Sequence, residues 1–157
     1  MNDLAVTDFV SFDDFPLRWR FADARRARLP AEALARVRPL SPAQAVIVAG
    51  VARSRCQDGR VFDVTFRSDD APPDVTARLR ALPLSPSTAI LVSWNGRTAV
   101  ASDWDVFVTH WEDFCYPASD DVTVWSIDAG WTLCYRHYEC FQFNSGLPAD
   151  SRATGPS

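Results

Sequence analysis

The sequence predicts an α+β domain, in which helices pack on one face of an antiparallel sheet of about five strands. Two strand-like runs flank Asn95-Gly96, the residue pair that most strongly favours a tight hairpin turn. An amphipathic helix is predicted over 103–115, and three further strand-like runs follow it. We therefore expect the stretch 94–143 to form the centre of the fold.

The chain has the size and composition of one ordinary globular domain. Its 157 residues are 47% hydrophobic, which suits one core and is too little chain for two domains. We predict a single domain over 1–143, in which 1–16 form either an arm laid on the body or a helical turn. Residues 144–157 are rich in Gly, Pro, Ser and Ala, so we expect them to form a flexible tail.

Hydropathy and cysteine content favour a reduced, cytoplasmic protein. No apolar run approaches the roughly 18 residues that span a bilayer, and the start of the chain is acidic where a secretory signal would be basic. A chain with a core of this size does not need disulfides. We therefore expect all four cysteines to be reduced, namely Cys56, Cys115, Cys134 and Cys140.

The first part of the chain is predicted to contribute two strands and three helices. The strands are expected at 17–21 and, after a turn at 57–60, at 61–66; the helices are expected at 30–37, from Ser41 onward and at 75–82. Residues 17–21 alternate apolar and basic, as in a strand with one apolar face. Ser41-Pro42 is typical of a helix N-cap followed by proline in the first turn. Asp74 is the predicted N-cap of the third helix.

The second part is predicted to form most of the sheet around one helix. Ser102 is the expected N-cap of the helix 103–115, and Tyr116-Pro117 ends it. Its apolar face consists of residues at helical spacing, namely Trp104, Phe107, Val108, Trp111 and either Phe114 or Cys115. The strands are expected at 89–94, 98–101, 121–126, 130–136 and 139–143.

Charge is divided unevenly along the chain. Residues 1–101 contain 14 arginines and 11 acidic residues, whereas residues 102–150 contain nine acidic residues and Arg136 alone. An acidic surface repels nucleic acid and attracts a basic protein or a cation. We therefore expect no nucleic-acid partner for the second part of the chain.

An acidic cluster is expected around the predicted helix and the loop after it. It comprises Asp103, Asp105, Glu112, Asp113, Asp120 and Asp121. Paired carboxylates suit a metal ion or general acid–base catalysis. A solvated helix and loop, or a partner-binding surface, explains the same residues, because acids in a first helical turn are stabilised by the helix dipole.

Cysteines and histidines raise one further chemical hypothesis. Cys115, Cys134, His137 and Cys140 are ligand types that zinc accepts, but they lack paired CxxC motifs, so reduced core cysteines are favoured. The sequence contains no dinucleotide fingerprint, phosphate loop or nucleophile elbow. We therefore expect a protein without enzymatic activity, cofactor or metal. The alternative is a small metal- or ligand-dependent enzyme that uses the acidic or Cys/His residues.

The aromatic residues of 94–143 exceed what packing in a domain of this size demands. Tryptophan and tyrosine are enriched at protein-binding hot spots. A platform for single-stranded nucleic acid would need basic neighbours, and these neighbours are acidic. The set consists of Trp94, Trp104, Trp111, Trp125, Trp131, Tyr116, Tyr135 and Tyr138.

The segment WDVFxxxWEDF, which starts at Trp104, resembles small bacterial proteins known as domains of unknown function. The early RWRF at 18–21 and the PLS at 39–41 contribute to the resemblance. It implies a compact α+β domain and no particular activity. In their style, small acidic tryptophan-rich domains are also similar to the immunity proteins of bacterial polymorphic toxin systems.

These observations lead to the hypothesis of an immunity-type protein that occludes a basic partner such as a toxin domain. The expected surface is formed by the helix 103–115 and the loop 116–121. Acidic residues would attract the partner and aromatic residues would anchor it. The predicted binding residues are Glu112, Asp113, Tyr116, Asp120, Asp121 and Trp125.

Overall fold

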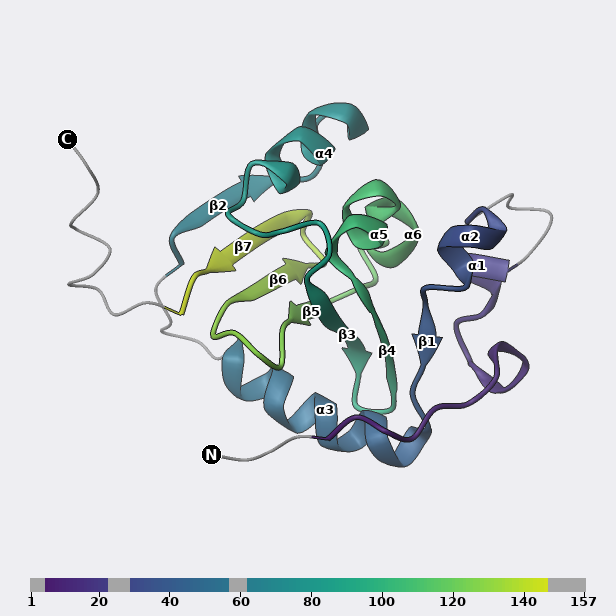
Figure 1. The fold of residues 1–157 in the computed structure, drawn as a ribbon. Helices are drawn as coiled ribbons and strands as arrows, with labels where there is room; N and C mark the ends of the chain where they lie inside the picture. The colour runs from purple at the N-terminus through teal and green to yellow at the C-terminus, as the bar shows by residue number, and fades with distance from the viewer. Residues whose placement is uncertain (1–4, 23–28, 57–61, 147–157) are drawn as a thin grey trace.

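A computed structural model describes residues 5–22, 29–56 and 62–146, and its centre is an antiparallel sheet (Figure 1). The seven strands lie in the order β1-β4-β3-β5-β6-β7-β2. The predicted α+β class is confirmed, with more strands than expected because short edge strands extend the sheet on both sides. The strands are β1 (Arg38–Pro39), β2 (Val64–Arg67), β3 (Ala89–Asn95), β4 (Thr98–Asp103), β5 (Val122–Trp125), β6 (Thr132–Arg136) and β7 (Cys140–Asn144).

The helices are short except for one. They are η1 (Phe12–Asp14), α1 (Trp19–Ala22), α2 (Ala31–Leu34), α3 (Pro42–Arg55), α4 (Pro72–Arg80), α5 (Trp104–Thr109) and α6 (Trp111–Phe114). None of the helices in the described part of the chain combines the length and the apolar character that crossing a membrane needs. The predicted turn at 57–60 and most of the predicted tail, residues 147–157, lie outside the described residues.

Helices cover both faces of the sheet, whereas the sequence predicted one covered face (Figure 1). Successive residues of β3 point to opposite faces, so Leu91 packs with α3 while Ile90 and Val92 join the core on the other side. That second, larger core also contains buried side chains of α4, α5 and α6. The central strands are therefore apolar on both faces, which explains why β3 is a nearly continuous hydrophobic run.

Two of the three predicted helix caps differ in the structure. Ser41 accepts a hydrogen bond from the backbone N–H of Gln44 at 3.1 Å and caps α3 as predicted. Asp103, rather than Ser102, caps α5 by accepting from the N–H of Val106 at 3.0 Å. Ala71, rather than Asp74, precedes α4. The predicted single helix 103–115 is divided into α5 and α6, because His110 leaves helical geometry.

The predicted strand at 17–21 is wrong, because residues Trp19–Ala22 form the helix α1. The alternation of apolar and basic residues suggested that Arg18 and Arg20 would share an exposed face. Arg20 is instead 5% exposed, and Phe21 beside it is also buried. A helical turn places both side chains in the interior, so tertiary contacts override the local pattern.

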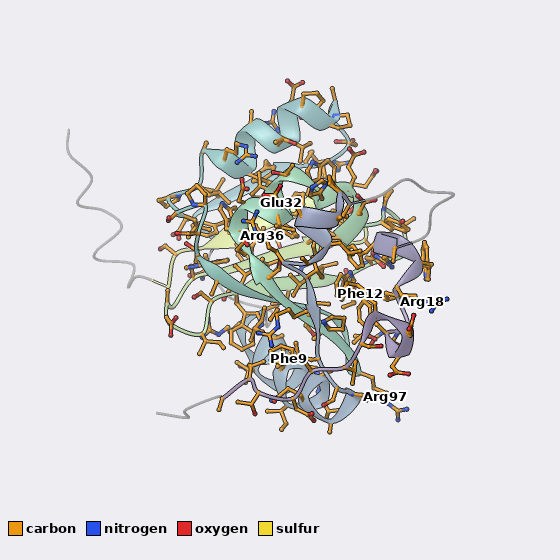
Figure 2. The ribbon with its side chains drawn as sticks, turned by 45° about the vertical axis from the view of Figure 1, so that its right-hand side comes forward. Phe9, Phe12, Arg18, Glu32, Arg36 and Arg97 are labelled. Carbon is orange, nitrogen blue, oxygen red and sulfur yellow. A yellow bond between two sulfur atoms is a disulfide. The ribbon has the colours of Figure 1, made fainter. Side chains whose placement is uncertain are left out.

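The N-terminal segment runs along the β1 side of the body, where Figure 2 labels Phe9, Phe12 and Arg18. Phe9 forms an isolated bridge with Leu40, and the N–H of Val10 donates to the carbonyl of Pro39 at 3.0 Å. The guanidinium of Arg38 lies 3.8 Å from the centre of the Phe9 ring. Backbone pairing therefore continues past the short strand β1 and covers this edge of the sheet.

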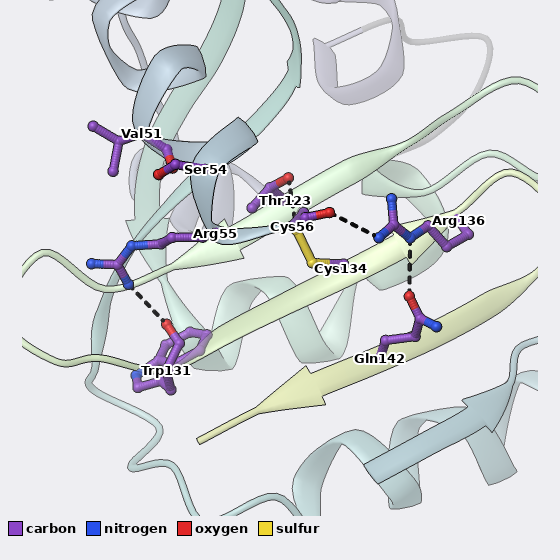
Figure 3. The surroundings of a disulfide bond; sticks show 9 residues. All are labelled: Val51, Ser54, Arg55, Cys56, Thr123, Trp131, Cys134, Arg136 and Gln142. Atoms are coloured by element: carbon purple, nitrogen blue, oxygen red, sulfur yellow. Dashed lines mark hydrogen bonds between the residues drawn. A yellow bond between two sulfur atoms is a disulfide. The ribbon is translucent and has the colours of Figure 1, made fainter. Parts of the chain in front are cut away.

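A disulfide joins Cys56, at the end of α3, to Cys134 on β6 (Figure 3). The expectation of four reduced cysteines is therefore wrong, and the free cysteines among the described residues are Cys115 and Cys140, both buried. Arg136 donates to the carbonyl of Cys56 at 3.2 Å and to Gln142 at 3.0 Å, which supports the same junction. Disulfides are typical of oxidising compartments, so the cysteines give no support for a cytoplasmic location.

We predict that Cys56→Ser lowers the free energy of unfolding by about 2–4 kcal/mol, because a bond between residues distant in sequence restricts the unfolded chain. Urea unfolding with and without dithiothreitol measures this. The reductant should destabilise the wild-type protein and leave the variant unchanged. The disulfide would be contradicted if the wild type unfolded equally with and without reductant and the mass of the untreated protein showed four free thiols.

Candidate functional site

A buried ion pair organises the region in which the binding residues were predicted. Two guanidinium nitrogens of Arg20 donate to the two carboxylate oxygens of Asp120 at 2.6 and 3.0 Å. The side chains are only 6% and 9% exposed. Asp120 also accepts from the backbone N–H of Tyr116 at 2.8 Å, and Arg20 donates to the carbonyl of Phe114 at 3.4 Å. The pair therefore fixes the loop after α6 onto α1.

Aromatic rings enclose this ion pair. The guanidinium carbon of Arg20 lies 4.3 Å from the ring centre of Tyr116 and 5.2 Å from that of Trp19. The indole N–H of Trp94 donates to the same Phe114 carbonyl at 2.7 Å, and its ring stacks on that of Phe114. Asp120 and half-buried Tyr116 are thus used inside the domain. The prediction that Asp120 faces a partner is corrected, because its carboxylate is already bound and buried.

Trp125 is not a surface anchor either. Its side chain is 1% exposed, packs against α3 and lies under Arg55, whose guanidinium carbon is 4.8 Å from the ring centre. The two covered faces of the sheet require more large side chains than one core would. Most of the aromatic set is buried for this reason, namely Trp104, Trp111, Trp125, Trp131 and Tyr135, and Tyr138 is the member with the most exposed side chain, at 53%.

The other predicted acidic residues lie near one end of the sheet. Glu112 and Asp121 are exposed, whereas Asp113 is half-buried and interacts electrostatically with His110. Burial lowers the pKa of His110, and the charges of Asp113 and Asp105 partly oppose that effect. Asp121 precedes β5, which places it beside the turn between β6 and β7.

Contacts between the β6–β7 turn and the loop after α6 hold Asp121 in place. Asp121 accepts from the backbone N–H of His137 at 2.9 Å, and the N–H of Ala118 donates to the carbonyl of His137 at 2.9 Å. Burial raises the pKa of the Asp121 carboxyl, but the hydrogen bonds from His137 outweigh it and lower that pKa overall. The carboxylate form of Asp121 is therefore favoured.

A cavity of about 250 Å³ opens at the same end of the sheet. Its wall includes Glu112 from α6 and two carboxylates that the sequence analysis missed, Asp69 after β2 and Glu139 before β7. The sheet order brings these distant segments together, since β2 pairs with β7 beside β6. The remaining lining residues are Ser68, Pro72, Trp111, Cys115, Pro117 and Tyr135.

We call this region the acidic end, defined by Asp69, Glu112, Asp121, Tyr138 and Glu139. Arg67 neutralises Asp69 through two hydrogen bonds of 3.2 and 2.9 Å. That hydrogen bonding raises the pKa of Arg67 and lowers the pKa of Asp69. The carboxylates of Glu112, Asp121 and Glu139 still leave a negative surface beside the exposed ring of Tyr138.

The zinc hypothesis for the Cys/His set is wrong, because Cys134 is bound to Cys56 in the disulfide. Burial raises the pKa of Cys115 well above its ordinary value, so this thiol is not an activated nucleophile. Across residues 5–22, 29–56 and 62–146, no group of three or more His, Cys, Asp or Glu side chains is arranged to hold a metal ion.

Comparisons of the chain with protein families, curated proteins and solved structures found no match. The geometry and charge of the site therefore carry the functional inference.

We predict that Asp120→Asn lowers the free energy of unfolding by about 3–5 kcal/mol, because removing one partner leaves the Arg20 charge buried and uncompensated. Urea unfolding of the variant measures the loss. Asp13→Asn is the matched control, since it breaks the exposed Arg18–Asp13 pair and should cost no more than about 1 kcal/mol. Equal effects in the two variants would show that the buried pair has no special structural role.

A second prediction concerns alkaline pH. Burial raises the pKa of the Tyr135 phenol to about 12, although its hydrogen bond with the Ser68 side chain acts in the opposite direction. Between pH 10 and 12 the unfolded state loses this proton and the folded state keeps it, so stability falls by up to about 1.4 kcal/mol per pH unit. Tyr135→Phe should reduce that slope in urea unfolding measured across the range. An unchanged slope would show that Tyr135 ionises normally in the folded protein.

Proposed function

We propose that this chain is a non-enzymatic protein-binding domain of the immunity type, which neutralises a basic toxin domain by covering it. The observation that carries the proposal is the acidic end, where exposed Glu112 and half-buried Glu139 line a cavity, and exposed Asp121 and Tyr138 lie on the neighbouring segments. Such a surface is complementary to the basic cleft of an enzyme that acts on an anionic substrate. Nucleic acid and anionic membranes do not fit as partners, because the same charges would repel them.

The proposed mechanism has two steps. Glu112, Asp121 and Glu139 attract the basic partner over a distance of about one Debye length, roughly 8–10 Å at moderate salt. Contact then buries the ring of Tyr138 and the rim of the cavity, which exclude water around the charged pairs. No bond in the partner is broken. Inhibition results from the physical obstruction of its cleft.

Rigidity of the acidic end supports this mechanism. Backbone hydrogen bonds link the loop after α6 to the turn before β7, and the Arg20–Asp120 pair fixes the start of that loop. A surface whose side chains are already positioned loses little conformational entropy on binding. A surface positioned in this way supports the proposed binding role, although several residues of the predicted set have structural roles instead.

The first experiment is affinity capture with the tagged protein from its native host, washed at low and at high salt, with mass spectrometry of the bound proteins. A basic partner that is retained at low salt and released at high salt supports the proposal. Co-expression must then relieve any toxicity of that partner. Failure to capture a basic protein, or a captured toxin that stays active in the complex, would refute it.

We predict that the double variant Glu112→Lys/Asp121→Lys slows association with the captured partner about tenfold at low salt, because steering charges act mainly on the association rate. Surface plasmon resonance at several salt concentrations measures this rate and its salt dependence. Asp14→Lys/Asp128→Lys is the matched control with the same change in net charge, because Asp14 is exposed in η1 and Asp128 is exposed on the β5–β6 connection at the opposite end of these strands. Equal slowing by the control variant would show that only the net charge matters.

A further inference from the structure

The size of the cavity at the acidic end restricts what it can hold. Its volume of about 250 Å³ lies below the roughly 300–1,000 Å³ of pockets that enclose drug-sized ligands. One long side chain of a bound protein fits a space of this size better than a substrate molecule does. The cavity also opens within the surface that we propose for partner binding, so a side chain of the partner can reach it directly.

The charges around the cavity favour a cation. Asp69 is engaged by Arg67, but the Glu112 side chain has no hydrogen bond or ion pair with another described residue. The Glu139 side chain interacts with Arg67 and Tyr135 only through longer-range electrostatics. Two carboxylates are thus available on the rim, one from α6 and one from the turn before β7.

The residues that line the cavity suit an arginine side chain better than a lysine side chain. Trp111, which is 6% exposed and donates its indole N–H to Thr76 at 3.2 Å, presents a fixed aromatic surface. Cys115 lines the cavity at 1% exposure, and its thiol has no hydrogen-bond partner among the described residues. A planar guanidinium stacks on aromatic rings and offers five donors to carboxylate and sulfur atoms, whereas an ammonium group is compact and strongly hydrated.

The domain already contains an arrangement of the same chemistry. Arg20 lies against the ring of Tyr116 at 4.3 Å while it binds the Asp120 carboxylate with two hydrogen bonds. The cavity offers a partner an aromatic wall, a buried thiol and rim carboxylates in a comparable combination. We propose that the cavity is a subsite for one arginine side chain of the basic partner, an inference that rests on the proposed function.

The test is an NMR titration of the nitrogen-15-labelled protein with N-acetyl-arginine methylamide. The indole N–H signal of Trp111, identified by its absence from Trp111→Phe, reports on the cavity. We expect this signal to shift with the arginine compound and to remain unmoved with the matching citrulline compound, which has the same shape without the charge. The indole signal of Trp125, in the core beside α3, should not move with either compound.

Two variants separate recognition from folding. Glu112→Gln keeps the size of the side chain and removes its charge. Glu139 has a φ of 62°, a left-handed conformation that glycine adopts without strain, so Glu139→Gly removes the carboxylate without lowering the melting temperature. Each variant should weaken binding of the arginine compound about tenfold, as expected for the loss of one charge-assisted hydrogen bond.

The possible results of the titration support or overturn the arginine subsite as follows. A Trp111 signal that does not respond to the arginine compound, or responds equally to citrulline, overturns the subsite. Full binding by both variants overturns it as well. The titration needs no partner. If it is negative while a basic protein is still captured in a salt-sensitive way, the subsite is refuted and the proposed function is not. A positive titration without any captured basic protein supports the arginine chemistry and refutes the proposed function.

Discussion

The buried pair of Arg20 and Asp120 is the interaction on which the candidate surface depends. It connects α1, near the start of the chain, to the loop that leaves α6, 100 residues later. Two charges in such a place are costly to desolvate. They are tolerated because both carboxylate oxygens and both terminal guanidinium nitrogens form hydrogen bonds, and because aromatic rings surround the pair. The pair determines the position of neighbouring segments more than it adds to the stability of the fold. It fixes where the loop 116–121 lies, and through that loop it fixes the acidic end.

The arrangement of the sheet brings the other residues of the acidic end together. The edge strand β2 returns beside β7, so the residues that follow β2 reach the turn that precedes β7. Asp69, Glu112 and Glu139 therefore meet around one cavity although long stretches of sequence separate them. The left-handed backbone of Glu139 is kept by hydrogen bonds of its N–H to Arg136 and of its carbonyl to Ser68. A charged residue at a position that glycine would favour is a local conflict between the sequence and the backbone conformation.

The two faces of the sheet have different means of stabilisation. The face toward α4, α5 and α6 buries a large aromatic and aliphatic core. The face toward α3 has a smaller core of alanine and aliphatic residues and Trp125, and the Cys56–Cys134 disulfide fastens the end of α3 to β6 there. A covalent bond on the less extensively packed face is physically reasonable, because less apolar area is available to hold the helix.

The sequence by itself determined the α+β class, the β3–β4 hairpin (with its turn at 96–97, one residue later than predicted), the start of α3 and most of the strands. These features depend on residue spacing and local hydrogen bonding, which are present in the sequence. The tertiary structure alone decided that Arg20 is buried in a helix, that Trp125 and Asp120 face inward, and that Cys56 meets Cys134. It also brought Asp69 and Glu139 to Glu112. Each of these results depends on which distant segments become neighbours, and no local pattern specifies that.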